Sequence, residues 1–503
     1  MRSTDDKHGS ASNMVTFYHD IEQDIDSEAD PGECRKVVKE FLELEKRYEV
    51  PATYNVVGRL FQEQPDLIEC ILREGQEVAF HSYNHQSDWQ PLYYSDEIDL
   101  CRKVSSIPYG YRSPRSQWDR NTLKTLWERG FLWNAECDTH KEPYFIHNGL
   151  VRLPIATDDW LLHTGDMDVD EWVKQFPVLL KSRPYFGFGS HDYITSFAPK
   201  DRLKAWERVL QMAVEDKVLM VTFSEAADLF RRAKVSRYYS STARDWNRGT
   251  KTLYRTKRFS ELIRGEAERL DQPVVVDLGS AGGVLSLPLQ DIAKKIYLID
   301  NAPGMVGEVS SNGRIRACPG DVTESNLPDR MCDFVICARI IEYLFWPDRL
   351  ADEIKRIGRI GATYLVTFPA FRETLPPHAG PAPDRIRRHF TPDEIRKWAD
   401  RIGPGRLIGI QYGVVEPDSP ETEERYRAIE KDHPPNAYPT NWVYIGRIEN
   451  GHATKRHKKI ISVSAFDFRF PGDRYERIRM CMDLVKRHIP KPILRLGKWV
   501  KGV

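Results

Sequence analysis

The sequence predicts an α/β protein with two successive domains, and three observations support this prediction. The chain has 503 residues, which is too long for one hydrophobic core and suits two or three domains. Short runs of β-branched or aromatic residues alternate with longer helical patterns in both halves, as in α/β architecture. A charged, polar stretch at 233–252 interrupts this alternation. We therefore expect a disordered lead at 1–13, domains at 14–235 and 236–450, and a basic C-terminal extension at 451–503.

The composition is that of a globular protein and predicts a cytoplasmic location. Hydrophobic residues make up 41% of the chain and aromatic residues 11%, which is enough to build ordinary cores. Apolar runs stay well short of the roughly 18 residues that a membrane-spanning helix needs. The polar N-terminus lacks the apolar core of a secretory signal. The eight cysteines are scattered without a CxxC pair, which fits a reducing compartment and argues against a zinc ribbon.

The formal net charge is zero, but charge is unevenly distributed along the chain. Residues 455–501 carry 14 lysines and arginines against four acids, so this tail has a net charge of +10. The rest of the chain is correspondingly acidic, which makes the two domains poor candidates for nucleic-acid binding. The tail is therefore the predicted contact surface.

A series of strands and helices in the first domain predicts a (β/α) barrel, complete or incomplete. Helical patterns such as Glu33–Tyr48 and Asp119–Arg129 lie between segments with strand character. In a barrel, the residues that follow each strand meet on one face, so motifs far apart in sequence can form one site. The predicted strands are Met14–Tyr18, Thr53–Val57, Glu77–Phe80, Gly149–Leu153, Tyr185–Gly189 and Val218–Thr222.

Three polar motifs follow predicted strands of this barrel and suggest a catalytic metal site. His81 and His85 are four residues apart, so their imidazoles can converge on one ion from a helical turn. A carboxylate from Asp20 or Glu22 would complete a three-ligand site, and the other carboxylate would serve as general base. Each motif alone is weak evidence, since paired histidines are often structural. Their order and spacing together are stronger.

Two further residues fit the chemistry of amide hydrolysis at such a site. His191, in Ser190-His191-Asp192, could protonate the departing amine. Arg112, in Tyr111-Arg112-Ser113-Pro114, could hold the base carboxylate in place. Asp20, Arg112 and His191 are thus the candidate catalytic residues.

The motifs together resemble the polysaccharide deacetylase family (carbohydrate esterase family 4, the NodB-homology domain) over roughly Met14–Phe230. The resemblance implies that Asp20 is the base and Glu22 a metal ligand, although these roles could be exchanged. It assigns His81 and His85 to the H-[ST]-x-x-H metal motif, Arg112 to the R-x-P motif and His191 to the final histidine motif. It also implies a divalent ion, with zinc expected, and an N-acetylated or N-formylated amino sugar as substrate.

The sequence departs from this family's pattern at three places. Glu22 stands where aspartate is common, and Arg115 stands where an aromatic residue is frequent. The family's aspartate–tryptophan motif is not clear around Trp133–Asp138. The first departure concerns metal affinity, and the other two concern contacts with the substrate.

The second domain contains a nucleotide-type fingerprint. Val274–Leu278 is an apolar strand that runs into the turn Gly279–Gly283, and a helix is expected through Leu285, so that its N-terminus favours negative charge. Ile296–Ile299 ends in Asp300, where an acid can accept hydrogen bonds from ribose hydroxyls. Asp321 follows the next strand. Further strands are expected at Arg314–Ala317, Phe334–Cys337 and Thr363–Phe368, and Thr391 caps a helix through Ile402.

This series resembles the class I S-adenosylmethionine-dependent methyltransferases over roughly Tyr238–Glu449, which have a Rossmann-like fold. The resemblance places Asp277, Gly279 and Gly283 beside the methionine part of S-adenosylmethionine. It implies that Asp300 contacts the ribose and that Asp321 contacts the adenine amino group. An NAD-binding Rossmann domain is the competing interpretation.

The two resemblances together imply a bifunctional sugar-modifying enzyme that deacylates an amino sugar and methylates a sugar amine or hydroxyl. The substrate would be nucleotide-linked, lipid-linked or a soluble glycoside, and the order of the reactions stays open. Two alternatives remain: a hydrolase of a non-sugar C–N bond, and an inactive deacetylase domain that serves as a binding module for the methyltransferase.

The basic tail contains an amphipathic pattern. Pro490 ends the predicted helix, and basic residues lie among its apolar positions. Such a segment can lie on an anionic membrane as a peripheral contact, or its apolar stripe can pack on the methyltransferase domain. The apolar positions with helical spacing are Tyr475, Ile478, Cys481, Met482, Val485 and Ile489.

Overall fold

A computed structural model describes most of the chain before the basic tail. The expectations for the N-terminal lead and for the amphipathic tail fall outside the described residues, apart from Asn13. Within the described part, no helix is both long and apolar enough to cross a membrane. The described residues are 13–23, 29–85, 93–146, 149–251, 253–370, 389–412, 416–432 and 439–449.

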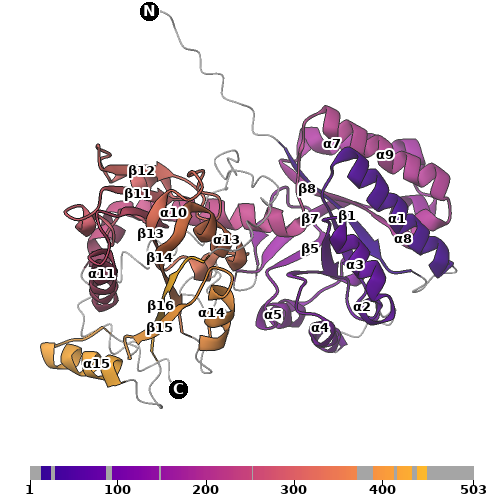
Figure 1. Ribbon diagram of the computed structural model, residues 1–503. Coiled ribbons are helices and arrows are strands. Elements are labelled where there is room, and N and C mark those ends of the chain that lie inside the picture. The colour runs from indigo at the N-terminus through magenta and orange to yellow at the C-terminus, as the bar shows by residue number, and fades with distance from the viewer. Residues whose placement is uncertain are drawn as a thin grey trace, which may run out of the picture. The chain divides into compact units, whose positions relative to one another are not determined.

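The first domain is a (β/α) barrel, which confirms the predicted fold (Figure 1). Seven parallel strands of the described residues form the barrel, and pairing of β1 with β2 closes it. Two short strands, β6 (Tyr144–Phe145) and β9 (Leu219–Met220), pair at its margins. The seven barrel strands are β1 (Met14–Ile21), β2 (Ala52–Val56), β3 (Glu77–Phe80), β4 (Gly110–Arg112), β5 (Trp133–Cys137), β7 (Val151–Thr157) and β8 (Tyr185–His191).

Side chains along β1 point alternately to its two faces. This alternation determines which of them face the outer helices and which face the candidate site. Val15 and Phe17 join the apolar cluster that packs under the outer helices, whereas Asp20 projects from the opposite face of the strand. The strand is longer than predicted and runs to Ile21, and β8 likewise runs to His191. In the parallel pairing of these strands, Asp20 lies directly beside His191. Two residues that are 171 positions apart are thus neighbours in one sheet.

Helices cover the outside of the barrel and bury most of its apolar surface. The largest cluster joins strand residues to α1 (Pro31–Tyr48), α7 (Val169–Ser182) and α9 (Pro199–Glu215). Asp168 and Glu171 form a capping box at the start of α7. The remaining helices are α2 (Leu60–Glu63), α3 (Pro65–Arg73), α4 (Tyr93–Val104), η1 (Pro114–Ser116), α5 (Arg120–Glu128), α6 (Trp160–Thr164) and α8 (Asp192–Ser196).

A single long helix, α10 (Phe223–Lys251), occupies the segment where the predicted domain boundary lies. Its first residue, Phe223, packs on Tyr18 and Trp133 of the barrel. Its later turns contact the short helix α12 (Pro303–Gly307) of the second domain. The polar residues 233–251 therefore belong to a helix that is shared by both domains.

The second domain is an open sheet with the strand order β12-β11-β10-β13-β14-β16-β15, in which β16 is antiparallel to both of its neighbours. Helix α11 (Tyr254–Ala267) packs on one face, and α13 (Pro347–Ile357) and α14 (Pro392–Ala399) pack on the other. The strands are β10 (Val274–Leu278), β11 (Lys295–Asp300), β12 (Ile315–Pro319), β13 (Cys332–Cys337), β14 (Gly358–Pro369), β15 (Gly405–Ile410) and β16 (Asn441–Arg447), and α15 (Pro420–Asp432) precedes β16.

Two local predictions for this domain were wrong in detail. The expected helix after the glycine-rich turn is absent from the described residues 279–290, which form turns and the short η3 (Leu287–Leu289). Pro288 cannot donate the hydrogen bond that a continuing helix would need, so the favourable charge of a helix N-terminus is not available here. The helix capped by Thr391 does form with its capping box, but it ends at Ala399 rather than Ile402.

Candidate metal centre and cofactor pocket

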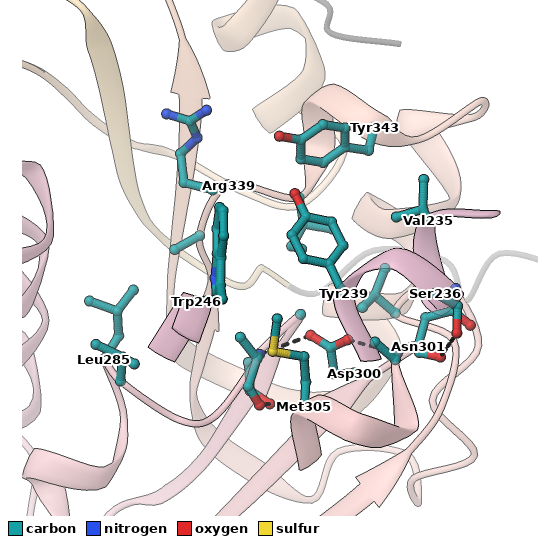
Figure 2. A pocket seen from close by; sticks show the side chains of 18 of the residues that line it. Val235, Ser236, Tyr239, Trp246, Leu285, Asp300, Asn301, Met305, Arg339 and Tyr343 are labelled. Atoms are coloured by element: carbon teal, nitrogen blue, oxygen red, sulfur yellow. Dashed lines mark hydrogen bonds between the residues drawn. The ribbon is translucent and has the colours of Figure 1, made fainter. Parts of the chain in front are cut away.

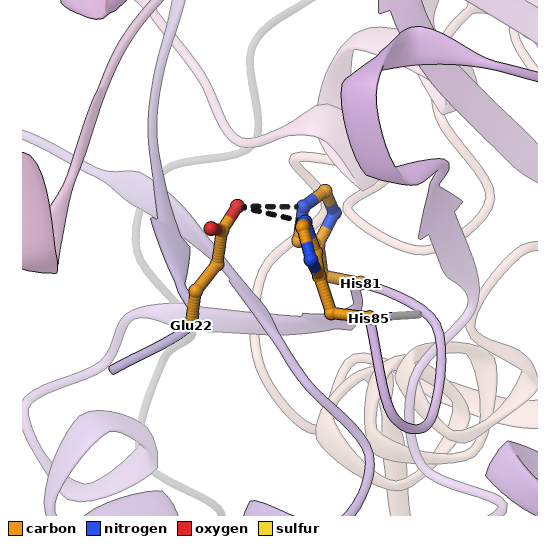
Figure 3. A group of neighbouring side chains, drawn as sticks. All are labelled: Glu22, His81 and His85. Atoms are coloured by element: carbon orange, nitrogen blue, oxygen red, sulfur yellow. Dashed lines mark hydrogen bonds and ion pairs between the residues drawn. The ribbon is translucent and has the colours of Figure 1, made fainter. Parts of the chain in front are cut away.

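The carboxylate of Glu22 faces the imidazoles of His81 and His85 at the strand ends of the barrel (Figure 3). Oε1 of Glu22 lies 3.0 Å from Nε2 of His81 and 3.3 Å from Nε2 of His85, and all three side chains are buried. Nδ1 of His81 donates to the backbone carbonyl of Arg112 at 3.1 Å, which leaves the lone pair of its Nε2 for a metal. One carboxylate and two imidazoles fit the donor set of a catalytic divalent ion.

The two histidines reach this position from a loop and not from a helical turn, contrary to the sequence prediction. Ser82 and His85 have φ values of +56° and +51°, in the left-handed region. The side chain of Glu97 on α4 accepts hydrogen bonds from two backbone N–H groups of the loop, at 2.9 and 2.6 Å. The loop is thus held in place by a buried carboxylate rather than by helical hydrogen bonds.

Asp20 is held beside the metal ligands by two donors. Nε of Arg112 donates to its Oδ2 at 2.7 Å, and Nδ2 of Asn55 donates to its Oδ1 at 2.8 Å. Burial opposes the charge of Asp20, but Arg112, His81 and His191 together lower the pKa of its carboxyl group. The carboxylate is therefore ionised at neutral pH and fixed in orientation.

His191 lies between two carboxylates and is oriented by a third. Its Nδ1 donates to Oδ1 of Asp159 at 2.6 Å, and its Nε2 lies 3.5 Å from Oδ2 of Asp20 and 3.9 Å from Oε1 of Glu22. Burial would lower the pKa of His191, but Asp159, Glu22 and Asp20 raise it well above its usual value. The imidazole therefore carries a proton that it can donate into the site.

Several residues of the site were not identified from the sequence. Asp158 lies 3.5 Å from Nη2 of Arg112, and Asp159 orients His191. Both follow β7, and Trp160 comes next, so an aspartate–tryptophan pair stands at a strand end after β7 and not after β5, where it was sought. The usable signal was the Asp-Asp-Trp sequence directly after an apolar strand.

Two buried carboxylates, Asp192 and Glu136, accept hydrogen bonds from the backbone near the site residues. Asp192 accepts hydrogen bonds from the backbone N–H groups of Glu22 at 3.0 Å and of Gln23 at 3.2 Å, and burial raises the pKa of Asp192 to about 7. Glu136 accepts from the backbone N–H of Ser113 at 2.9 Å, next to the segment that carries Arg112. These contacts hold the backbone at Glu22 and Gln23, which follow the candidate base, and at Ser113, which follows Arg112.

The second domain contains a pocket beside the carboxyl ends of β10, β11 and β12 (Figure 2). This is the point where strand order reverses around β10, with β11 on one side and β13 on the other, and ligands of such sheets bind there. Gly279, Asp300 and Asp321, three predicted cofactor residues, line the pocket. Figure 2 shows aromatic rings of Tyr239, Trp246 and Tyr343 around the same space.

The glycine-rich turn is held in a conformation that admits a ligand closely. Gly279 has φ +78°, and a Cβ there would lie 2.1 Å from Cγ1 of Ile340. Ala281, which replaces the middle glycine of the fingerprint, has φ +47° and donates its N–H to Oδ2 of Asp300 at 2.8 Å. Oδ1 of Asp300 accepts from the N–H of Ala302 at 2.8 Å. Each oxygen of Asp300 thus keeps a lone pair for a further donor, which fits a ribose diol.

The other two predicted cofactor residues stand apart from this lining. Asp277 is buried behind the turn, where Oγ of Ser286 donates to it at 2.6 Å, and burial raises the pKa of Asp277 to about 7. Gly283 packs against Leu287 and also lies outside the group of lining residues. Both positions shape the turn rather than face the pocket.

Comparisons with known proteins agree with this geometry. A family model described as polysaccharide deacetylase matches residues 24–131, and one described as methyltransferase domain matches residues 276–366. The chitooligosaccharide deacetylase of Bradyrhizobium sp. (strain ANU 289) is 28% identical over 106 residues, which cover 19% of this chain and 48% of that protein. The peptidoglycan-N-acetylglucosamine deacetylase of Bacillus cereus is 26% identical over 174 residues, covering 30% and 77% of the two chains.

The chain spans about half the length of the first of these relatives. Among solved structures, the family 4 carbohydrate esterase from Streptomyces lividans in complex with acetate aligns with a TM-score of 0.31 at 16% identity, covering 42% of this chain and 93% of that one. The match to a methyltransferase model agrees with the interpretation of the second domain and not with an NAD-binding one. The chain therefore carries a polysaccharide deacetylase domain followed by a methyltransferase domain.

Proposed function

We propose that the barrel is a metal-dependent N-deacylase of amino sugars and that the second domain is an S-adenosylmethionine-dependent methyltransferase acting on a sugar. One observation supports the proposed deacylase activity of the barrel. Glu22, His81 and His85 form a buried donor set, directly beside the pairs Asp20–Arg112 and His191–Asp159. This juxtaposition supplies metal ligands, a base and an acid within one site.

A divalent ion bound by Glu22, His81 and His85, with zinc expected, would polarise the amide carbonyl and lower the pKa of a water molecule. Asp20 would serve as the base toward the attacking water, because Arg112 and Asn55 hold its carboxylate in a fixed orientation. The opposite assignment, with Glu22 as base, is less favoured. Oε1 of Glu22 faces both imidazoles, whereas Asp20 is already engaged by Arg112.

His191 donates the proton that the leaving amine needs. Asp159 accepts from its Nδ1, which directs Nε2 toward the space beside Asp20 and Glu22. Asp159 is the largest cause that raises the pKa of His191, and it favours the protonated imidazole that a general acid needs. Base and acid therefore begin the reaction in the required protonation states.

The named relatives act on chitooligosaccharides and on peptidoglycan N-acetylglucosamine. By analogy, the substrate of the barrel is an N-acetylated or N-formylated amino sugar. In the cytoplasm it would be a nucleotide-linked, lipid-linked or soluble glycoside. The methyl acceptor of the second domain is a sugar amine or hydroxyl, and Gly279, Asp300 and Asp321 hold S-adenosylmethionine.

Mass spectrometry of products tests this proposal. The chain is incubated with a panel of N-acetyl and N-formyl amino sugars, and with small cyclic amides, with and without S-adenosylmethionine. Loss of an acyl group from a sugar, and gain of 14 mass units only with the cofactor, is the expected result. Turnover of cyclic amides alone would favour a non-sugar hydrolase. Bound metal without turnover of any amide would favour an inactive barrel that acts as a binding module.

A further inference from the structure

Helix α10 runs along the cofactor pocket and contacts the loops that form it. Ser236 donates from Oγ to the backbone carbonyl of Asn301, after β11, at 2.8 Å. Asn247 accepts at 3.1 Å from the N–H of Gly282, in the glycine-rich turn after β10. Arg232 forms an ion pair with Asp321, after β12. Residues of a helix that begins on the barrel therefore hold the loops after three adjacent strands.

The contact between Arg232 and Asp321 determines what that carboxylate can still accept. Oδ1 of Asp321 accepts from the N–H of Thr323 at 2.8 Å and from its Oγ1 at 2.7 Å. A carboxylate oxygen accepts about two hydrogen bonds, so Oδ1 is fully used. Nη1 of Arg232 takes one acceptor position on Oδ2. Among the contacts of the described residues, one acceptor position of Asp321 remains on Oδ2, and the residue lines the pocket.

Arg232 is itself fixed in orientation. Its Nε lies 2.8 Å from Oδ2 of Asp228, one helical turn earlier on α10. The two side chains are only 18% and 10% exposed. Burial would lower the pKa of Arg232, but the carboxylates of Asp228 and Asp321 raise it. The planar guanidinium is thus held between two carboxylates and cannot turn away from Asp321 without breaking an ion pair.

We propose that Arg232 is a positioning residue that sets the specificity of the pocket for an adenine ring. Its ion pair with Oδ2 of Asp321 holds that carboxylate in one orientation and so fixes the direction of the remaining lone pair, which accepts one N–H of the 6-amino group. A base with a 6-oxo group offers an oxygen at that place, which the carboxylate repels. This inference rests on the proposed binding of S-adenosylmethionine. It goes beyond it by assigning base selectivity to a residue of the connecting helix.

Titration calorimetry of the full chain with two probes tests the inference. The probes are S-adenosylhomocysteine and S-inosylhomocysteine, which differ only in the 6-amino and 6-oxo groups. The ratio of their dissociation constants should favour the adenosyl compound by about 100-fold or more in the unaltered chain. Arg232→Gln should reduce this ratio about tenfold, and Arg232→Lys should keep part of it, since lysine preserves the charge but not the planar geometry. Arg244→Ala, on the exposed side of the same helix, should leave the ratio unchanged.

A second variant separates specificity from folding. Removing Arg232 leaves Asp228 buried without its cation, so Asp228→Asn/Arg232→Gln is measured as well. A reduced ratio in both variants supports the inference, because the ratio compares two ligands on the same folded protein. An unchanged ratio in both overturns it and leaves the proposed methyltransferase function intact. Failure of the unaltered chain to bind S-adenosylhomocysteine overturns the cofactor proposal itself.

Discussion

The barrel site and the cofactor pocket hold their acidic groups in opposite ways. In the barrel, Asp20 and Glu22 are buried beside histidines, and Asp20 also beside Arg112, and these partners lower the pKa of both carboxyl groups despite burial. In the second domain, Asp277 and Asp300 are bonded by hydroxyl and backbone N–H donors, and burial raises the pKa of both. In the barrel, charged groups are therefore paired with one another, whereas Asp300 in the pocket keeps acceptor capacity for a ligand.

The largest effect on activity is expected from loss of a proposed metal ligand in the barrel. His81→Ala or His85→Ala should lower both metal content and the deacylation rate by more than about 100-fold, since even second-sphere changes cost 10–100-fold. Metal analysis and acyl-release assays on the same preparation measure this. His140→Ala is the control, because His140 is an exposed histidine of the same domain. A metal-free double variant that retains full activity would show that these ligands are misassigned.

Removal of the Asp159 carboxylate tests how this residue sets the pKa of His191, the proposed general acid. A general acid must be protonated to act, and Asp159 raises the pKa of His191. In Asp159→Asn that pKa falls, so the alkaline limb of the pH–rate profile should move to lower pH. The rate at neutral pH should then fall by about tenfold or more. An unmoved alkaline limb would mean that His191 is not the acid. Asp138→Asn, which alters the exposed pair with His140, should leave the profile unchanged.

In the cofactor pocket the expected effect is on affinity alone. Asp300→Ala should weaken S-adenosylhomocysteine binding by roughly 10- to 100-fold, because a bonded pair of hydroxyls loses a charged acceptor. Calorimetry measures this, and Asp291→Ala, an exposed acid of the same domain, serves as the control. Deacylation should be nearly unchanged in both. Equal affinities in Asp300→Ala and the unaltered chain would remove Asp300 from the ribose site.

The smallest effect concerns the pH dependence of the free energy of unfolding. The carboxyl groups of the two regions are expected to change this free energy in opposite directions. Asp277 has a folded pKa of about 7 against an ordinary 3.8, so its folded form binds the proton more tightly. Its contribution to stability is therefore lost as pH rises from about 4 to about 7. Asp277→Asn should remove a loss on the order of 1 kcal/mol between about pH 6 and pH 7, measured by urea unfolding. The lowered pKa values of Asp20 and Glu22 predict the reverse, a loss of stability as pH falls.

Residue types and spacing in the sequence were sufficient to predict the barrel and to group most of the residues that lie together in its candidate site. Parallel strands bring their carboxyl ends to one face, so polar motifs after apolar strands could be grouped before their distances were known. Asp20, His81 and His191 come together in this way. The short strands β4 and β5 were not predicted, because three residues that end in an arginine, or five that include an asparagine and a glutamate, carry little strand pattern.

Other partners of these residues could not be predicted, because they depend on contacts between distant segments. Asn55 is an ordinary polar residue in sequence, and only the closed sheet places it against Asp20. The loop conformation at His81–His85 depends on Glu97 of a separate helix. Arg232 falls in the first domain by the boundary predicted from the polar stretch at 233–252, yet helix α10 brings it to Asp321 of the second domain.

Metal dependence of deacylation is the most direct test of the account. Acyl release from an N-acetylated amino sugar would be measured before chelation, after exhaustive chelation and after return of one equivalent of zinc. The account predicts that activity is lost with the metal and restored with it, while S-adenosylhomocysteine affinity stays constant in all three samples. Deacylation that persists in metal-free protein would contradict the assignment of Glu22, His81 and His85.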